Sequence, residues 1–389
     1  MDRRRLATIL VLGTAQTLAW GSTYYLPAVL ADEIARDIGI STNLFFGTFS
    51  ASLIISAVIG PKVGRVIDRA GGNGVLSASN LLFAAALVLL SQSHSFLPFA
   101  LAWTLMGVGM GLGLYDAAFG ALGRLYGKDA RGAITGITLL AGFASTVAWP
   151  LTAWGAAEIG WRETCLLWAA AHIVIGLPCN SLLLPRPTDL AATIKAADEP
   201  VPFDRTMVLL GIAFALAWVV TAGMAAHFPR IMEAAGASPT QAIAAGALIG
   251  PAQVAARMLE AGPLRRLHPL VSGRLATTTH PVGAAVLLTF GGGVAASAFA
   301  VLHGMGNGVL TIARGTVPLA LYGPKNYGYR LGLLGAPSRF LSAGAPLLFA
   351  LLIDRLGAGV LLISSALCVV AFLALLMIRL PVPHASSAD

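Results

Sequence analysis

The chain has 389 residues, of which 57% are hydrophobic and only 11% are charged. A soluble domain is about 45–50% apolar and about a quarter charged, so this composition excludes an ordinary soluble protein and is typical of a membrane protein. The net charge of +8 does not indicate a nucleic-acid partner, because short loops between membrane segments carry an excess of Lys and Arg. Three isolated cysteines, Cys165, Cys179 and Cys368, predict neither a metal site nor a disulfide.

The apolar residues gather into twelve runs. About 20 apolar residues are needed for a helix to cross the hydrocarbon core of a bilayer, and each run has about that length. The runs cover residues 6–30, 42–61, 74–91, 97–123, 132–157, 164–184, 206–231, 240–262, 274–291, 294–321, 331–353 and 358–380. We therefore predict an all-α integral membrane protein with twelve transmembrane helices.

A polar, proline-rich segment divides the chain near its middle, at residues 185–205. It predicts two six-helix bundles, over 1–184 and 206–380, with a central loop between them and a tail at 381–389. The two halves resemble each other at nearly constant spacing. The matching residues include Trp20 with Trp218, Gly107 with Gly304, Tyr126 with Tyr322 and Pro150 with Pro346.

The distribution of charge predicts how the helices are oriented. With the N-terminus placed in the cytoplasm, most of the 25 Lys and Arg residues fall in cytoplasmic loops. The positive-inside bias therefore predicts both termini, the central loop and the tail in the cytoplasm of a cell bounded by a plasma (inner) membrane.

Between the second and third apolar runs the sequence reads GPKVGRVIDRAGGNG. It resembles the loop signature G-x-x-x-D-R-x-G-R of the major facilitator superfamily, with Gly64, Asp68, Arg69 and Gly71 in place and Gly72 where a basic residue is usual. The resemblance implies two pseudo-symmetric six-helix bundles, a functional monomer, transport by alternating access, and a gating role for this loop. The alternative is a solvated turn without a gating role.

Three strongly ionisable side chains lie deep inside apolar runs: Asp116, Arg314 and Arg339. Such residues are costly in hydrocarbon and are candidates for a functional site. Asp116 and Arg314 occupy equivalent places in the two halves, and the superfamily resemblance implies that their helices line a central cavity. We expect an ion pair that substrate or a proton can open; the alternative is a permanent structural pair.

Further polar residues recur at helical spacing. In the tenth predicted helix His303, Asn307 and Thr311 share a face with Arg314, and this stripe predicts a water-filled path or, alternatively, hydrogen bonds between helices. The first and seventh predicted helices offer further substrate-contact candidates: Gln16, Trp20 and Trp218. Arg257 and Glu260 are one turn apart, so we expect them to pair with each other near an inner gate.

These observations together predict a secondary transporter and not an enzyme, because there is no P-loop and no nucleophile–base constellation. Two intramembrane arginines against one acid favour a small organic anion or oxyanion, moved with protons. The alternative is an efflux pump for toxic compounds such as a drug or arsenite. No cofactor, metal or nucleic-acid partner is expected; the expected partners are the substrate, protons and the lipid bilayer.

Overall fold

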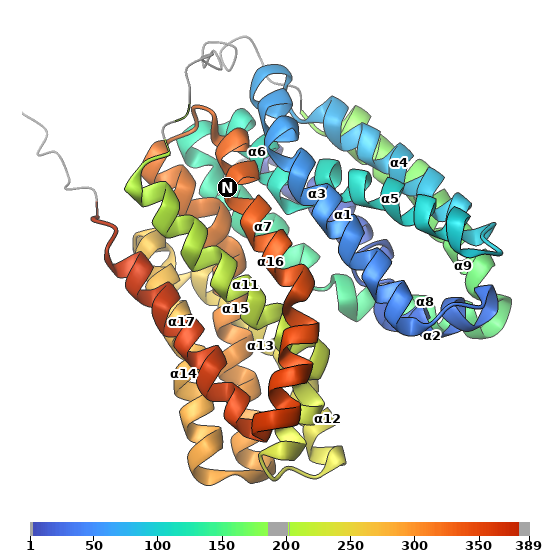
Figure 1. Ribbon diagram of the computed structural model, residues 1–389. Helices are drawn as coiled ribbons and strands as arrows, with labels where there is room; N and C mark the ends of the chain where they lie inside the picture. Colours follow the sequence, from blue (N-terminus) through green and yellow to red (C-terminus); the bar gives the residue numbers. More distant parts are fainter. Residues whose placement is uncertain (1–2, 186–200, 202, 381–389) are drawn as a thin grey trace, which may run out of the picture.

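The computed structural model describes residues 3–185, 201 and 203–380. Nearly every described residue outside short turns is helical, and the helices form two bundles, one from each half of the chain (Figure 1). The predicted all-α class is confirmed. The predicted tail, 381–389, and most of the predicted central loop, 185–205, lie outside the described residues.

The N-terminal bundle contains α1 to α9. Its helices are α1 (Arg3–Ser22), α2 (Pro27–Ile38), α3 (Thr42–Ala70), α4 (Asn73–Ser91), α5 (Phe96–Gly113), α6 (Tyr115–Tyr126), α7 (Arg131–Ala141), α8 (Ala144–Ile159) and α9 (Trp161–Ala171). Two π-helical stretches, His172–Gly176 and Cys179–Leu183, continue α9. Within the bundle α4 packs against α5 and α9, and α1 packs against α7.

The C-terminal bundle contains α11 to α17. Its helices are α11 (Arg205–Ala234), α12 (Pro239–Ala247), α13 (Ile249–Ala261), α14 (Pro269–Phe290), α15 (Gly292–Tyr322), α16 (Tyr327–Leu356) and α17 (Val360–Leu376). Here α14 packs against α15 and α17, and α11 packs against α16 and α17.

Eight described segments are long and apolar enough to cross a membrane. Two of them, Phe96–Ile159 and Tyr327–Leu376, have 64 and 50 residues, and each contains two crossings, α5–α6 followed by α7–α8 and α16 followed by α17. The remaining long helices, α1 and α14, have 20 and 22 residues. The structure is thus consistent with the twelve predicted crossings.

Several crossings predicted as continuous helices are interrupted. The first crossing turns between Ser22 and Pro27, and the fourth breaks at Leu114, whose backbone is extended. This break frees the carbonyl of Gly113, which accepts a hydrogen bond of 2.6 Å from the Gln16 side chain of α1. The periodicity of apolar residues does not reveal such breaks, because the same apolar composition continues on both sides of them.

The segment predicted as a loop around Gly64–Gly71 is instead the end of a helix. α3 continues through Gly64, Asp68 and Arg69, and Gly71 follows it with a positive φ of 84°. These last turns of α3 are packed on two sides: Ile67 is completely buried and lies against Gly120 of α6, and Gly64 lies against Gly328 of the neighbouring bundle.

The two bundles meet at the side of the molecule where α1 begins and α17 ends, called here the terminal side. The main contacts between them join α3 and α6 with α16, and α7 with α13 and α15. Away from this side the bundles diverge (Figure 1). The structure is therefore closed at the terminal side.

Glycines allow α3 and α16 to approach closely at the terminal side. A Cβ atom added at Gly64 would lie 2.1 Å from the carbonyl oxygen of Gly328, and one added at Gly332 would lie 2.5 Å from that of Gly60. Both neighbours are backbone atoms that cannot move aside without separating the helices. Small residues of this kind favour close helix packing in membranes.

We expect Gly64→Ala to lower the thermal unfolding midpoint of the purified protein, because overpacking of this kind costs about 1–3 kcal/mol. Gly74→Ala on α4 is the matched control, since nothing lies within 4 Å of its added Cβ. Circular dichroism melting of both variants in detergent measures the difference. Equal midpoints for the two variants would contradict the proposed close packing.

Candidate functional site

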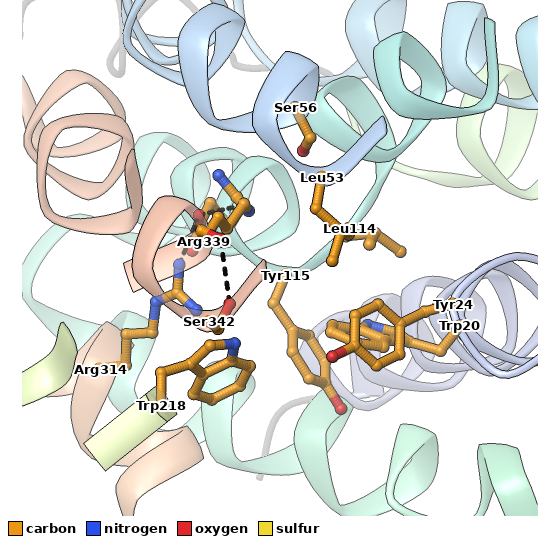
Figure 2. A pocket seen from close by; sticks show the side chains of 11 residues that line it. Trp20, Tyr24, Leu53, Ser56, Leu114, Tyr115, Trp218, Arg314, Arg339 and Ser342 are labelled. Carbon is orange, nitrogen blue, oxygen red and sulfur yellow. Dashed lines mark hydrogen bonds and ion pairs between the residues drawn. The ribbon is translucent and has the colours of Figure 1, made fainter. Parts of the chain in front are cut away.

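A pocket lies between the two bundles, with a volume of about 410 Å³ when the space open to solvent is included. Its lining comes from α1 and the turn that follows it, from α3, α6, α11, α15 and α16, and from the break before α6. The residues are Trp20, Tyr24, Leu53, Ser56, Leu114, Tyr115, Asp116, Trp218, Arg314, Arg339 and Ser342 (Figure 2).

One wall of the pocket holds the three ionisable residues singled out in the sequence. Oδ2 of Asp116 accepts a hydrogen bond of 2.8 Å from Nη2 of Arg314 and another from Nη2 of Arg339. The Asp116 and Arg314 side chains are only 8% and 9% exposed. One carboxylate from the N-terminal bundle is thus bound by two guanidinium groups from the C-terminal bundle.

The position of Asp116 follows from the break in the fourth crossing. Because α6 begins at Tyr115, Asp116 lies in its first turn, where the helix dipole favours a negative charge. The ion cluster packs against the backbone of α16: a Cβ atom added at Gly335 would lie 2.5 Å from Asp116 Oδ2 and 2.7 Å from Arg314 Nη2. The ion cluster therefore lies directly against Gly335.

The other wall of the pocket is aromatic. The Trp20 ring centroid lies 4.8 Å from that of Tyr115 and 5.2 Å from that of Tyr24. On the charged side the Arg314 guanidinium lies over the Trp218 ring, 5.1 Å from its centroid. Figure 2 shows Trp20 and Tyr24 facing Arg314 and Trp218 across the pocket, with Tyr115 between them.

The remaining residues predicted for the site lie outside the pocket lining. His303 and His280 of α14 place their Nδ1 atoms 3.0 Å apart in the interior of the C-terminal bundle. Asn307 accepts a hydrogen bond of 3.3 Å from Thr221, and Thr311 donates to the carbonyl of Asn307. The contacts of His303 and Asn307 join different helices, as in the alternative considered for the stripe, whereas the Thr311 contact lies within α15.

Other lining residues were not singled out from the sequence. Besides Tyr24, these are Leu53, Ser56, Leu114, Tyr115 and Ser342. For Tyr115 the sequence contains one indication of a place in the site, namely its position next to Asp116 in an apolar run. For Ser56 and Ser342 the sequence contains no such indication, since serines are frequent at helix contacts in membranes.

At the terminal side Asp68 joins the two bundles. Its carboxylate accepts hydrogen bonds of 2.8 Å from the backbone N–H groups of Gly328 and Tyr329, in the first turn of α16. Asp68 is 7% exposed, and the Arg65 guanidinium lies 4.0 Å from the centroid of the Tyr329 ring. Asp68 thus occupies the helix N-terminus of the opposite bundle, where an anion is stabilised.

A second junction joins α7 and α13. Glu260 accepts a hydrogen bond of 2.8 Å from Arg131, and Arg257 donates one of 3.0 Å to the carbonyl of Thr138 near the end of α7. The expected pairing of Arg257 with Glu260 is wrong, because each side chain reaches across to the other bundle instead. Spacing within one helix cannot reveal a partner on another.

His268 lies beside this junction, outside the membrane segments. Burial lowers its pKa, and the positive charges of Arg131 and Arg274 lower it further. The imidazole is therefore neutral near pH 7, and its Nδ1 accepts a hydrogen bond of 3.2 Å from the N–H of Leu270 at the start of α14.

We expect Gly335→Ala to displace the ion cluster while the helices remain in place, because the atoms it meets are the ends of side chains. Transport should fall at least about tenfold, since small displacements of bound groups are costly. The matched control is Gly344→Ala on the same helix, which meets nothing within 4 Å. Uptake into proteoliposomes and thermal unfolding should be measured together; full transport by Gly335→Ala would contradict a functional cluster.

Comparisons with known proteins agree with the fold. No curated protein matches the sequence. The fold is similar to the crystal structure of the human organic anion transporter MFSD10 (TETRAN), with a TM-score of 0.73 and 17% sequence identity over 96% of this chain and 100% of that chain. A sequence model of the Major Facilitator Superfamily matches residues 12–300, most of the chain. The chain is therefore a multi-pass membrane protein that belongs to the Major Facilitator Superfamily.

Proposed function

We propose that this protein is a secondary active transporter that carries a small organic anion or oxyanion by alternating access, without transforming it chemically. The observation behind the proposal is the charge of the pocket: two arginines and one aspartate line it. With all three ionised, the site carries one net positive charge at low exposure. An anion removes this imbalance, and guanidinium groups bind carboxylates and oxyanions well.

The similar human structure is described as that of an organic anion transporter. At 17% identity this likeness supports the fold, and the anion proposal rests on the pocket. The diverging bundles and the junctions at the terminal side support alternating access about this site.

Proton coupling is part of the proposal, and the sharing of Asp116 supports it. Its Oδ2 atom binds both arginines, so protonation of the carboxylate weakens both contacts at once. The released guanidinium N–H groups can then bind the substrate anion in place of Asp116. Entry of a proton together with a monovalent anion leaves the net charge of the site at plus one, and loss of the proton from Asp116 then makes the loaded site neutral.

The terminal side is proposed to face the cytoplasm of a plasma (inner) membrane, with the protein acting as a monomer. Arg5, Arg65, Lys128 and Arg266 all lie at this side, as the positive-inside bias requires of a cytoplasmic face. In that orientation the structure represents a state closed to the cytoplasm.

The coupling proposal is tested with proteoliposomes that contain a pH-sensitive dye. The panel comprises small carboxylates, oxyanions, arsenite and cationic drugs. Wild-type protein should move protons with carboxylates or oxyanions, Asp116→Asn should abolish proton movement, and Arg314→Ala should reduce transport at least about tenfold. Asp354→Asn is the control, since it removes an exposed ion pair with Arg230 inside one bundle.

Proton movement driven only by arsenite or drugs would favour the efflux alternative and reject the anion proposal. Normal, pH-dependent transport by Asp116→Asn would leave the ion cluster a structural role only.

The two junctions at the terminal side are proposed to be the cytoplasmic gate, in which Arg69 and Gly71 complete the end of α3. We expect Glu260→Gln and Asp68→Asn to shift the population toward a cytoplasm-open state, because each removes a charge-assisted contact between bundles. Spin labels at Lys128 and Arg266, exposed on opposite bundles, should report longer distances in electron resonance measurements.

Asp37→Asn provides the control for the gate. It breaks a 2.7 Å ion pair with Arg162 that lies within the N-terminal bundle, so the distance between the labels should not change. Identical distance distributions in wild type, Glu260→Gln and Asp68→Asn would reject the gate.

A further inference from the structure

We propose that the pocket selects monovalent anions that carry an aromatic ring next to the charged group, such as aromatic monocarboxylates. This inference rests on the proposed anion transport and specifies its substrate class. Its basis is the division of the pocket into a charged wall and an aromatic wall (Figure 2).

The charge of the site sets the charge of the ligand. Asp116, Arg314 and Arg339 sum to one positive charge when ionised, and the Asp116 and Arg314 side chains are 8% and 9% exposed. Uncompensated charge is expensive at such burial. A monovalent anion neutralises the site, whereas a divalent anion leaves a buried negative charge and a cation increases the imbalance.

Unpartnered donors set the position of the charged group. Nε of Arg314, Nη1 of Arg339 and Oγ of Ser56 are buried without a hydrogen-bond partner. A buried donor without a partner costs about 1–3 kcal/mol, so these groups favour a ligand that accepts hydrogen bonds. A carboxylate has two acceptor oxygens, so it can bind donors of this kind.

The aromatic wall provides a surface for a ring. Trp20 contacts Tyr24 and Tyr115, and Tyr115 stacks on Phe119 behind it, with ring centroids 5.2 Å apart and planes 11° from parallel. This stacking fixes the orientation of the Tyr115 ring. Nε1 of Trp20 is also buried without a partner, although buried tryptophans usually find one.

A short aliphatic anion would occupy only the charged wall and leave the aromatic rings without a contact. An aromatic monocarboxylate contacts both walls at once, with its carboxylate near the arginines and its ring against Trp20, Tyr24 and Tyr115. The ring contact adds affinity that aliphatic anions of the same charge lack.

The test uses purified full-length protein and isothermal titration calorimetry, with uptake into proteoliposomes as a second readout. The probes are benzoate, acetate, phthalate, benzamide and benzylammonium. We expect benzoate to bind about tenfold or more tightly than each of the others, since tenfold corresponds to about 1.4 kcal/mol. Arg339→Gln should weaken benzoate and acetate alike.

Variants of the aromatic wall separate ring recognition from charge recognition. Trp20→Leu should weaken benzoate binding about tenfold and weaken acetate binding much less. Tyr24→Leu, at a half-buried position, is the second variant if Trp20→Leu unfolds. Trp154→Leu is the matched control, because Trp154 is 61% exposed on α8, outside the pocket.

Equal binding and transport of acetate and benzoate would overturn this inference and leave anion transport intact. The same holds if the preference for benzoate survives in both aromatic variants. If benzylammonium is carried and no carboxylate is, the proposed function itself falls.

Discussion

The arrangement of the two bundles around the pocket depends on one carboxylate shared by two guanidinium groups. Asp116 belongs to the N-terminal bundle, and Arg314 and Arg339 belong to the C-terminal bundle. In a low-dielectric interior such charges attract strongly but are costly to bury, so their partnership holds only while the geometry is good. Gly335 and the first turn of α6 provide that geometry. The same cluster joins the bundles and contains hydrogen-bond donors of Arg314 and Arg339 that have no protein partner and can bind a ligand.

The terminal side closes by a related principle, in which charged side chains satisfy helix ends of the opposite bundle. Asp68 accepts from the first turn of α16, and Arg257 donates to the carbonyl of Thr138 near the end of α7. An acid at a helix N-terminus and a base at a helix C-terminus are both favoured by the helix dipole. The two junctions therefore use the same interaction, a charged side chain at a helix end of the opposite bundle, although their residues differ.

The membrane spans and the internal repeat could be predicted from the sequence, because they follow from hydropathy and from residue identity. The repeat also brought Asp116 and Arg314 to equivalent positions, and the structure places them in contact. The sequence could not predict that the His303 side chain contacts His280 of α14 and not the pocket. Helical spacing places residues on one face of α15 but does not say which neighbour each of them meets. Pairing across bundles, as for Glu260 with Arg131, depends on helix placement that spacing within a helix does not encode.

The hydrogen bond between Gln16 and Gly113 has a mechanical consequence. Gln16 and Trp20 lie one turn apart on α1, so both must move when that helix rotates. Gln16 holds the carbonyl at the end of α5, immediately before the residue that starts the bend into α6. α1 therefore connects the pocket with the break in the fourth crossing: a displacement of Trp20 together with α1 would also displace the Gly113 carbonyl, next to the extended Leu114 that positions Asp116.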